Sequence, residues 1–170
     1  MQICLVDFDG TLVSNSLDLY SEALGIKIEN LKNPRETTKG VLKLLKDRNI
    51  LEVLKLKEKL NYRRELIKEL YNEKNEGVLV YLLSDNPFVK YLIDKKFDGI
   101  YSTIVPEIKD GILTGGILKE YTKVEIAEGI LADIEDISKI KVYTDGGESD
   151  EELIEYLQRN YGEKVKIYRY

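Results

Sequence analysis

Short apolar runs alternate along the chain with longer stretches in which apolar residues recur at helical spacing. Strand-length runs lie at residues 3–6, 78–83 and 140–144, and the second is continuously apolar, as expected of a strand buried on both faces. Weaker strand patterns cover residues 99–105 and 165–168, and the last of these alternates like an edge strand. Helix-like stretches separate the runs, so the pattern predicts an α/β fold with a parallel sheet.

The stretch between the first two strand runs, residues 15–76, is helical in pattern and heavily charged. It predicts three helices, the second opened by Pro34 and the third running from about Ile50 to Tyr71. A parallel crossover needs only about a dozen residues. We therefore expect this region to form an inserted helical lid, rather than a simple long connection, on a core built from residues 1–14 and 77–170.

Beyond the second strand run, turn residues at 109–111 and 114–116 predict a small hairpin. A helix is expected to follow from about residue 123, and the last helix is expected to begin at Ser149.

Composition restricts the chemistry open to this chain. Its 170 residues are 43% hydrophobic and 34% charged, which suits one globular domain or one domain with a modest insertion. There is no histidine, so histidine-based acid–base catalysis and histidine-ligated zinc are excluded. The lone cysteine, Cys4, is expected to be a small core residue, without a disulfide or a cysteine metal site. Any catalysis must use carboxylates, Lys, Ser, Thr, Tyr or a hard cation.

Charge and hydropathy set expectations about partners and location. The net charge is −5 and the tyrosines follow no basic stripe, so a nucleic-acid partner is not expected. No apolar run is long enough to span a bilayer. Met1 is followed at once by the first strand run, which leaves no room for a signal peptide. We therefore expect a cytoplasmic protein without a membrane partner, and the oligomeric state stays unknown.

The first strand run leads directly into two acidic residues, Asp7 and Asp9. Burying ionised carboxylates is costly unless they are paired or bound to a metal ion. The carboxyl ends of parallel strands form the usual ligand crevice of an open α/β sheet. Gly10 follows and allows the backbone to approach a ligand closely. This stretch is therefore the first candidate for a functional site.

The sequence of residues 7–11, Asp-Phe-Asp-Gly-Thr, resembles the first motif of the haloacid dehalogenase superfamily, whose phosphatase members carry Asp-x-Asp-Gly-Thr after their first strand. The further polar residues that follow in the order used by this superfamily are Ser84, Lys123, and Asp145 with Asp150. The resemblance implies a Rossmann-like core with a type-1 helical cap, here the lid, as in the phosphoserine-phosphatase-like subgroup. That subgroup's substrate-selecting Glu, shortly after the first motif, is not evident in this chain.

The resemblance implies roles for the residues of the first motif. Asp7 would attack phosphorus and form an aspartyl-phosphate, which divides one difficult hydrolysis into two easier steps. Asp9 would protonate the leaving alcohol and then deprotonate the attacking water. Gly10 and Thr11 would help to bind the phosphoryl group. The alternative is a solvated turn with two exposed acids.

The second strand run ends in Ser84, Asp85 and Asn86, and Pro87 then opens a helix. Ser84 would hydrogen-bond a phosphoryl oxygen beside a helix start that favours anions, unless it serves only the turn. Members of the similar subgroup often have Ser-Gly-Gly at this point, so Asp85 and Asn86 are departures. Both remain candidate phosphate-binding residues, although Asp85 adds an acid beside the pocket.

Lys123 precedes an apolar-periodic helix, at the place where the resembling phosphatases carry a lysine. It would pair with the nucleophile and offset negative charge in the transition state. Lys119 lies about one helical turn earlier and competes for this role. The alternative for either residue is a solvated lysine.

Asp145 ends a strand run, where the resemblance implies that it ligates Mg²⁺ together with Asp7 and the backbone carbonyl of Asp9. Mg²⁺ prefers hard oxygen ligands, which suits a site built mainly of carboxylates. Asp150 matches the second acid of the superfamily's pattern, and Glu148 is an alternative.

Asp150 also has a purely structural interpretation. Ser149 and Glu152 form a capping-box pattern, in which Asp150 would be an ordinary acid of the first helical turn.

Together these features predict a Mg²⁺-dependent phosphomonoester hydrolase that acts on a small phosphorylated metabolite. One alternative is a phosphotransferase or phosphomutase with the same aspartyl-phosphate, and another is a non-catalytic binding module on the same fold. The lid residues Arg35, Lys39 and Arg48 would either meet a carboxylate or second phosphate of the substrate or simply solvate helix faces.

Overall fold

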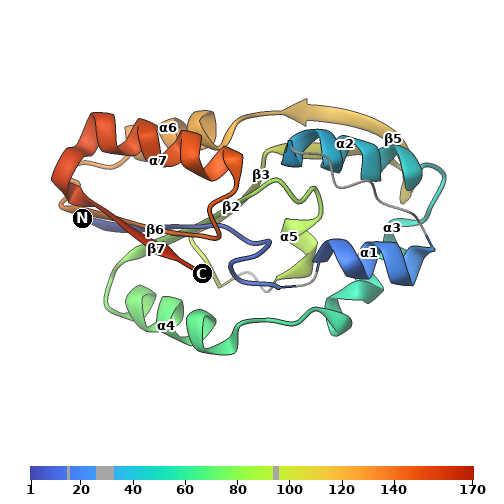
Figure 1. The fold of residues 1–170 in the computed structure, drawn as a ribbon, viewed down its shortest axis with the longest axis horizontal. Helices are drawn as coiled ribbons and strands as arrows, with labels where there is room; N and C mark the ends of the chain where they lie inside the picture. The colour runs from blue at the N-terminus through green and yellow to red at the C-terminus, as the bar shows by residue number, and fades with distance from the viewer. Residues whose placement is uncertain (15, 26–32, 94–95) are drawn as a thin grey trace.

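The computed structural model describes residues 1–14, 16–25, 33–93 and 96–170 (Figure 1). Its core is a five-stranded sheet with the order β3-β2-β1-β6-β7, in which all neighbouring strands run parallel. These strands are β1 (Gln2–Val6), β2 (Leu79–Ser84), β3 (Gly99–Ser102), β6 (Lys139–Thr144) and β7 (Val165–Arg169). The predicted α/β class is confirmed, and β7 lies at an edge of the sheet as its alternating pattern predicted.

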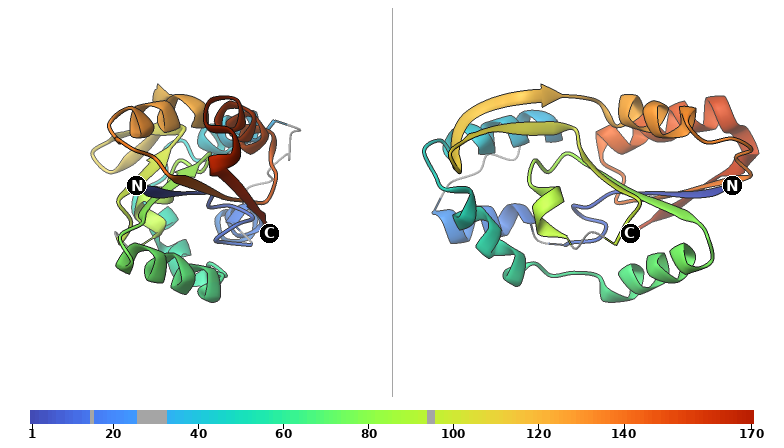
Figure 2. Two further views of the ribbon diagram at one scale, coloured as in Figure 1. Left: turned by 90° about the vertical axis from the view of Figure 1, so that its left-hand side faces the viewer. Right: turned by 180° about the vertical axis from the view of Figure 1, so that it is seen from behind.

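Helices cover both faces of this sheet (Figures 1 and 2). They are α6 (Lys123–Ala132) and α7 (Glu148–Tyr161) on one face and α4 (Arg64–Asn75) on the other. Ile3 and Leu5 of β1 belong to the apolar cluster shared with α6 and α7. Cys4 and Val6 belong to the cluster shared with α4. Successive strand residues point to opposite faces, and β1 is buried on both, which explains its continuous apolar run.

The chain between β1 and α4 forms a group of short helices beyond the carboxyl ends of the strands (Figure 1). They are α1 (Ser16–Leu24), α2 (Pro34–Leu44), α3 (Ile50–Leu54) and the 3₁₀ helix η1 (Lys55–Lys59). The Asn33 side chain accepts hydrogen bonds from the backbone N–H groups of Arg35 and Glu36. This N-cap places Pro34 at the first helical position, which confirms the predicted helix start.

The predicted hairpin is formed by β4 (Ile104–Lys109) and β5 (Ile112–Glu120). Its turn uses Asp110 and Gly111 at φ values of 50° and 79°. Two successive residues at positive φ are typical of the tight turns that match the twist of paired strands. The hairpin packs along α2 and lies beside the short helices rather than in the main sheet (Figure 1).

Backbone hydrogen bonds join the hairpin to the segment after α2. The Asp47 N–H donates to the Leu113 carbonyl (2.8 Å), and the Leu113 N–H donates to the Arg48 carbonyl (2.9 Å). Residues from β5 therefore help to hold the helices that lie over the sheet's carboxyl edge.

One predicted helix is wrong. The pattern predicts a single helix from about Ile50 to Tyr71, but the structure has α3, η1 and α4 with non-helical residues 60–63 between them. In this break the Arg63 N–H donates to the Leu12 carbonyl (2.9 Å). The backbone bonds to the loop after β1 here instead of to its own preceding turn, which is the physical reason that the helix stops.

The position of α4 bears on where the lid ends. Leu66 and Leu70 of α4 are buried in the same cluster as sheet residues, so α4 is a covering helix of the sheet. We propose that the inserted part ends near residue 63, although the sequence pattern placed its end at 76. The division at residues 15–76 is otherwise a prediction, and residues 15 and 26–32 of that range lie outside the described residues.

Two short elements complete the fold, namely α5 (Val89–Leu92) after β2 and the 3₁₀ turn η2 (Gly162–Lys164) before β7. Within the described part of the chain, every helix is too short or too polar to cross a membrane.

Candidate active site

Asp7 follows β1 and lies at the centre of the candidate site. Its side chain is 7% exposed. Oδ1 accepts a hydrogen bond from Lys123 Nζ (2.7 Å), and Oδ2 accepts one from Thr11 Oγ1 (3.2 Å). The Asp7 N–H donates to the carbonyl of Tyr143 in β6 (2.9 Å). Hydrogen bonds therefore fix both the backbone and the carboxylate of Asp7, and Thr11 is one of the donors to the carboxylate.

Lys123 is the first residue of α6, and its ammonium group is buried, with 2% of the residue exposed. A capping box fixes this helix start: the Thr122 hydroxyl accepts from the Glu125 N–H (3.0 Å), and the Glu125 carboxylate accepts from the Thr122 N–H (2.7 Å). Nζ then reaches Asp7. Lys119, the competitor in the sequence, is exposed on β5 and lines a separate groove.

Asp150 lies on the other side of the Lys123 ammonium group. Its Oδ1 accepts from Lys123 Nζ (2.5 Å), and its Oδ2 accepts from Thr144 Oγ1 (2.7 Å). Asp150 is 3% exposed, in the first turn of α7. One buried cation therefore joins the acid after β1 to the acid at the start of α7.

The capping-box interpretation of this helix start is wrong. Helix α7 begins at Glu148 with Gly147 as its N-cap, and no side chain caps it. The Ser149 hydroxyl, which the pattern offered as the cap, donates to Asp85 instead (2.6 Å). Asp150 is consequently a buried and paired group, not a solvated acid of the first turn.

Asp145 follows β6, is exposed, and lies against Gly10 of the first motif. A Cβ atom on Gly10 would be 1.9 Å from Asp145 Oδ2, and Gly10 has a φ of +77°, so only glycine fits there. Carboxylate oxygens of Asp7, Asp145 and Asp150 lie within 4.8 Å of one another. This donor set fits a hard divalent cation. Among the described residues, Glu148 is not part of the cluster.

Comparison with known proteins identifies relatives by structure. No protein-family profile matches the sequence, and no curated protein matches it. A substrate-bound phosphoserine phosphatase complex is 26% identical over 91% of this chain and 82% of its own, with a TM-score of 0.71. A phosphoserine phosphatase in apo form is 29% identical over the same shares, with a TM-score of 0.67. A phospho-aspartyl intermediate analogue of phosphoserine phosphatase is 26% identical over 98% of this chain and 91% of its own, with a TM-score of 0.69.

The chain is phosphoserine-phosphatase-like and has the fold of the haloacid dehalogenase superfamily. A HAD family hydrolase from Salmonella enterica subsp. enterica serovar Typhi, with a TM-score of 0.75 and 18% identity, supports the fold alone.

The second acid of the first motif, Asp9, is surrounded by donors in this haloacid dehalogenase-type phosphatase. Ser84 Oγ donates to its Oδ2 (3.4 Å), and Asn86 Nδ2 donates to its Oδ1 (3.4 Å). The hydroxyl of Ser16, at the start of α1, also donates to Oδ1. Elements from the sheet edge and from the inserted helices thus orient one carboxyl group.

Asp85 accepts hydrogen bonds from the segments that surround the loop after β2. Its carboxylate accepts from Thr103 Oγ1 and Ser149 Oγ, both at 2.6 Å. Its carbonyl accepts from Thr38 Oγ1 of α2 (3.2 Å). An ionised carboxylate only accepts hydrogen bonds. If Asp85 donates a hydrogen bond to a phosphoryl oxygen, the donor is therefore its backbone N–H.

Asn86 is buried and forms hydrogen bonds within the protein through its amide oxygen, its amide nitrogen and its backbone N–H. Its Oδ1 accepts from the Phe88 N–H (2.9 Å) and from the Tyr20 hydroxyl (3.2 Å), while its own N–H donates to Ser84 Oγ (3.0 Å). The structure brings Asn86 to Asp9, so an orienting role is favoured over direct phosphate contact.

Sequence reasoning missed Ser16, Tyr20 and Thr144 as parts of the site. Ser16 and Tyr20 reach the site from α1, and Thr144 holds Asp150. Thr144 had a positional signal, because it immediately precedes Asp145 at the end of a predicted strand. Ser16 and Tyr20 had none that distinguishes them from a helix-capping serine and an apolar-face tyrosine.

Burial dominates the electrostatics of the acids. It raises the pKa of Asp7 well above its ordinary value, although the Lys123 ammonium acts in the opposite direction. It also raises the pKa of Asp9, opposed by the hydrogen bonds from Ser16 and Asn86. For Lys123, burial lowers the pKa, but the charges of Asp7 and Asp150 outweigh it and the net pKa is raised. A bound divalent cation would favour the ionised acids.

The cationic residues of α2 meet an acid of the hairpin. Arg35 and Lys39 both pair with Glu120 Oε1, at 2.8 and 3.0 Å. Arg48 pairs with Glu52 on the same surface segment (3.1 Å). Arg35 and Lys39 lie on the same side of α2 as Thr38, whose hydroxyl contacts the loop after β2.

Proposed function

We propose that this protein is a Mg²⁺-dependent phosphomonoester hydrolase that acts on a small phosphorylated metabolite through an aspartyl-phosphate on Asp7. The observation that carries the proposal is the buried Lys123 ammonium group, which bridges Asp7 and Asp150 beside Asp145. A cation buried among carboxylates at the sheet's carboxyl edge suits a site that handles a phosphate dianion.

Asp7 is the proposed nucleophile, and one of its oxygens attacks phosphorus as the bond to the leaving alcohol breaks. Lys123 remains beside the Asp7 carboxylate and lowers the electrostatic cost of bringing a phosphate dianion to it. The Ser84 hydroxyl, at the end of β2, is the proposed ligand for a phosphoryl oxygen.

Asp9 is the proposed general acid and base. Its raised pKa favours a protonated carboxyl that gives its proton to the leaving oxygen. The same group, now ionised, takes a proton from the water that hydrolyses the aspartyl-phosphate. Ser16 and Asn86 orient the carboxyl group for both transfers.

Asp7, Asp145 and the backbone carbonyl of Asp9 are the proposed Mg²⁺ ligands. When bound, Mg²⁺ supplies positive charge that screens the acids and orients the phosphate. Asp150 belongs to the same carboxylate cluster and also accepts a hydrogen bond from Lys123. It therefore stabilises two positive charges, the proposed Mg²⁺ ion and the Lys123 ammonium group.

The basic residues of α2 do not define the substrate class, because carboxylates of the chain balance them. Arg35 and Lys39 both pair with Glu120, and Lys39 also pairs with Glu36 (2.9 Å). Several structural relatives are phosphoserine phosphatases, and phosphoserine is therefore the first compound to assay. A cytoplasmic location remains a prediction.

The proposal is tested with the purified protein and an aryl phosphate, in Mg²⁺ and in EDTA, comparing wild type with Asp7→Asn. We expect turnover that needs Mg²⁺ and falls about a thousandfold or more in Asp7→Asn. Lys164→Glu, at the far edge of the sheet, is the control and is expected to turn over like the wild type. Adding a second alcohol separates hydrolysis from transfer, because a phosphotransferase would form a new phosphoester.

Phosphoserine and phosphorylated carboxylates are then assayed in the same way, to meet the case of an enzyme too selective for aryl phosphates. Activity of Asp7→Asn equal to that of the wild type would overturn the mechanism. Absence of turnover with every phosphoester, together with normal folding, would favour the non-catalytic binding module instead.

A further inference from the structure

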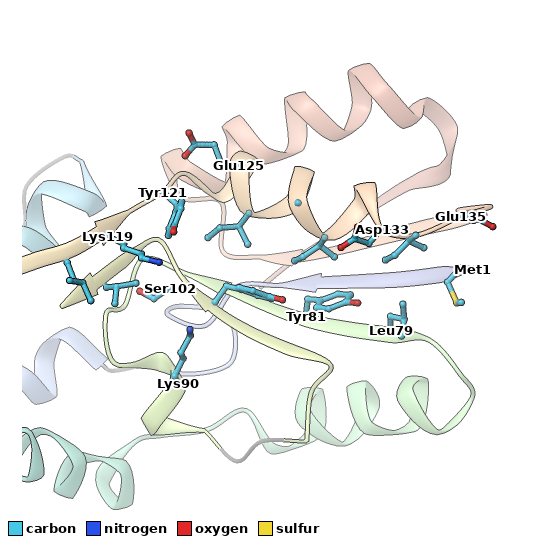
Figure 3. A pocket seen from close by; sticks show the side chains of 17 residues that line it. Met1, Leu79, Tyr81, Lys90, Ser102, Lys119, Tyr121, Glu125, Asp133 and Glu135 are labelled. Carbon is cyan, nitrogen blue, oxygen red and sulfur yellow. The ribbon is translucent and has the colours of Figure 1, made fainter. Parts of the chain in front are cut away.

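A groove with a volume of about 1040 Å³ lies between α6 and strands β2 and β3 of the sheet (Figure 3). Tyr81 of β2 and Tyr101 of β3 line it from the sheet, and Ile126 and Ile130 line it from α6. We call it the α6 groove. None of the proposed catalytic or metal-binding residues lines it, so the proposed phosphatase chemistry does not account for it.

Large apolar side chains are exposed around the α6 groove. Met1, Leu118 and Tyr121 line it and are 52%, 64% and 39% exposed. Among the described residues, β3 is an edge strand of the sheet and pairs on one side, with β2. Large exposed apolar side chains along a groove are typical of an interaction site, and an open strand edge is a second feature that a partner can cover.

The charges of the α6 groove are divided between its two ends. Lys90 and Lys119 lie toward one end, and Asp133 and Glu135 lie toward the other (Figure 3). In the described part of the chain, none of these four side chains forms an ion pair. Glu125 also lines the groove, but its carboxylate is used in the cap of α6.

The separation of basic and acidic side chains favours one kind of occupant of the α6 groove over others. A small ligand is usually held by polar groups that converge on one point, whereas these charges lie apart. A partner of one charge would match only one end. A second copy of the chain, related by a two-fold axis that crosses the middle of the groove at right angles to its length, would place each basic end against an acidic end, since a two-fold interface pairs a patch with itself.

We propose that the α6 groove is the interface of a two-fold symmetric dimer of this chain. Tyr81, Ile126 and Ile130 form its apolar centre, Leu118 and Tyr121 add apolar surface beside Lys119, and the four charged residues form its rim. Lys119 of one copy faces Asp133 of the other, and the reverse contact occurs by symmetry. The dimer leaves the candidate active site of each copy outside the interface.

The proposal is tested by sedimentation velocity over a concentration series, with wild type, Lys119→Glu, Asp133→Lys and an equimolar mixture of the two variants. Wild type is expected to dimerise. Each variant alone places like charges together twice, so we expect its dimer Kd to rise about tenfold or more. The mixture pairs Glu with Lys at one contact and restores the native pair at the other, so a heterodimer of near wild-type affinity is expected.

Two further variants complete the design. Leu118→Ser is expected to weaken the dimer without rescue by mixing, because it removes apolar contact area. Lys164→Glu makes the same charge change on the opposite side of the sheet and is expected to leave the dimer unchanged. A monomeric wild type overturns the proposal, and so does a dimer that the groove variants leave intact or a mixture that fails to restore association. Circular dichroism checks the folding of each variant.

Discussion

Lys123 is the residue on which the charge balance of the site depends. Its ammonium group is 2% exposed and lies between two carboxylates. A buried charge that loses its partner is strongly destabilising. In EDTA, we expect Lys123→Met to reduce the free energy of unfolding by about 3 kcal/mol. In Mg²⁺, we expect it to reduce turnover at least about a hundredfold. Urea unfolding and initial rates measure the two effects.

Lys119→Met is the matched control for that variant, because Lys119 is exposed and forms no contact with the candidate site. It should turn over like the wild type, because the proposed dimer interface that contains Lys119 lies outside the candidate site. If Lys119→Met lost activity and Lys123→Met kept it, the assignment of the lysine would be reversed.

Cys4 gives a prediction about pH. Burial, with a contribution from the Glu73 charge, raises the pKa of its thiol from 9.0 to about 12. Between these values the folded chain keeps a proton that the unfolded chain has lost, so stability falls as pH rises through this window. We expect no reaction of native Cys4 with Ellman's reagent at pH 8, and full reaction in denaturant. A fast reaction of the native protein would contradict its burial.

A Cys4→Ala variant separates the thiol from other groups that titrate in the same window. The pKa of Tyr143 is also raised, chiefly by burial, and it contributes in the same direction. We therefore expect the variant to lose stability with pH less steeply than wild type, but not to become independent of pH. Guanidinium unfolding at several pH values between 8 and 11 would show it.

At the scale of single residues, the sequence was most informative where chemistry is rare. Burying two ionised carboxylates directly after an apolar strand costs free energy unless they are paired or bound to a metal ion. For this reason Asp7 and Asp9 were predicted to be functional. Ser16 and Thr144 were not predicted because hydroxyl groups are common at helix starts and strand ends. Their partners, Asp9 and Asp150, lie only seven and six residues away, so each contact depends on how the intervening loop turns, which the apolar pattern does not specify.

Among the elements, α4 shows how helical spacing alone can mislead. The pattern joined it to the preceding helices, because apolar residues recur at helical spacing on both sides of residues 60–63. The break depends on a backbone bond from Arg63 to Leu12, a contact between segments some fifty residues apart. The strands were predicted better, since a strand buried on both faces must be apolar throughout.

The assignment of α4 to the covering layer of the sheet leads to a test. Leu70 has no exposed surface and lies in the cluster shared with the sheet, whereas Leu51 of α3 is 61% exposed. We expect Leu70→Ala to lower the free energy of unfolding by about 3 kcal/mol and Leu51→Ala to change it by less than about 0.5 kcal/mol. Chemical denaturation measures both, and equal small effects would argue that α4 is only loosely attached.

Considered as a whole, the molecule brings its inserted helices to the carboxyl edge of the sheet through contacts with two loops. Ser16 of α1 reaches Asp9 after β1, and Tyr20 reaches Asn86 after β2. Thr38 of α2 also reaches the loop after β2, at the Asp85 carbonyl. The helices therefore touch the same loops that carry the candidate chemistry, and a substrate between them would contact both parts.

The concentration of acids at this edge also makes a prediction for the intact protein. Asp7 and Asp150 share the buried Lys123 ammonium group, and Asp145 adds a third carboxylate to the cluster. The folded site therefore gathers more negative than positive charge, whereas in the unfolded chain these charges are far apart. A cation that binds only the folded state stabilises it, by about 2.7 kcal/mol at a hundred times its Kd. We therefore expect Mg²⁺ to raise the unfolding temperature of the wild type in a concentration-dependent way and EDTA to reverse the shift.

Two variants locate the ion responsible for that shift. Asp145→Asn removes a charge from the carboxylate cluster and should abolish most of the effect of Mg²⁺. Glu148→Gln removes a nearby charge that lies outside the cluster among the described residues and should leave the effect intact. Thermal unfolding of both variants, with and without Mg²⁺, distinguishes a specific site from general screening of an acidic protein, because screening would respond equally to the two substitutions.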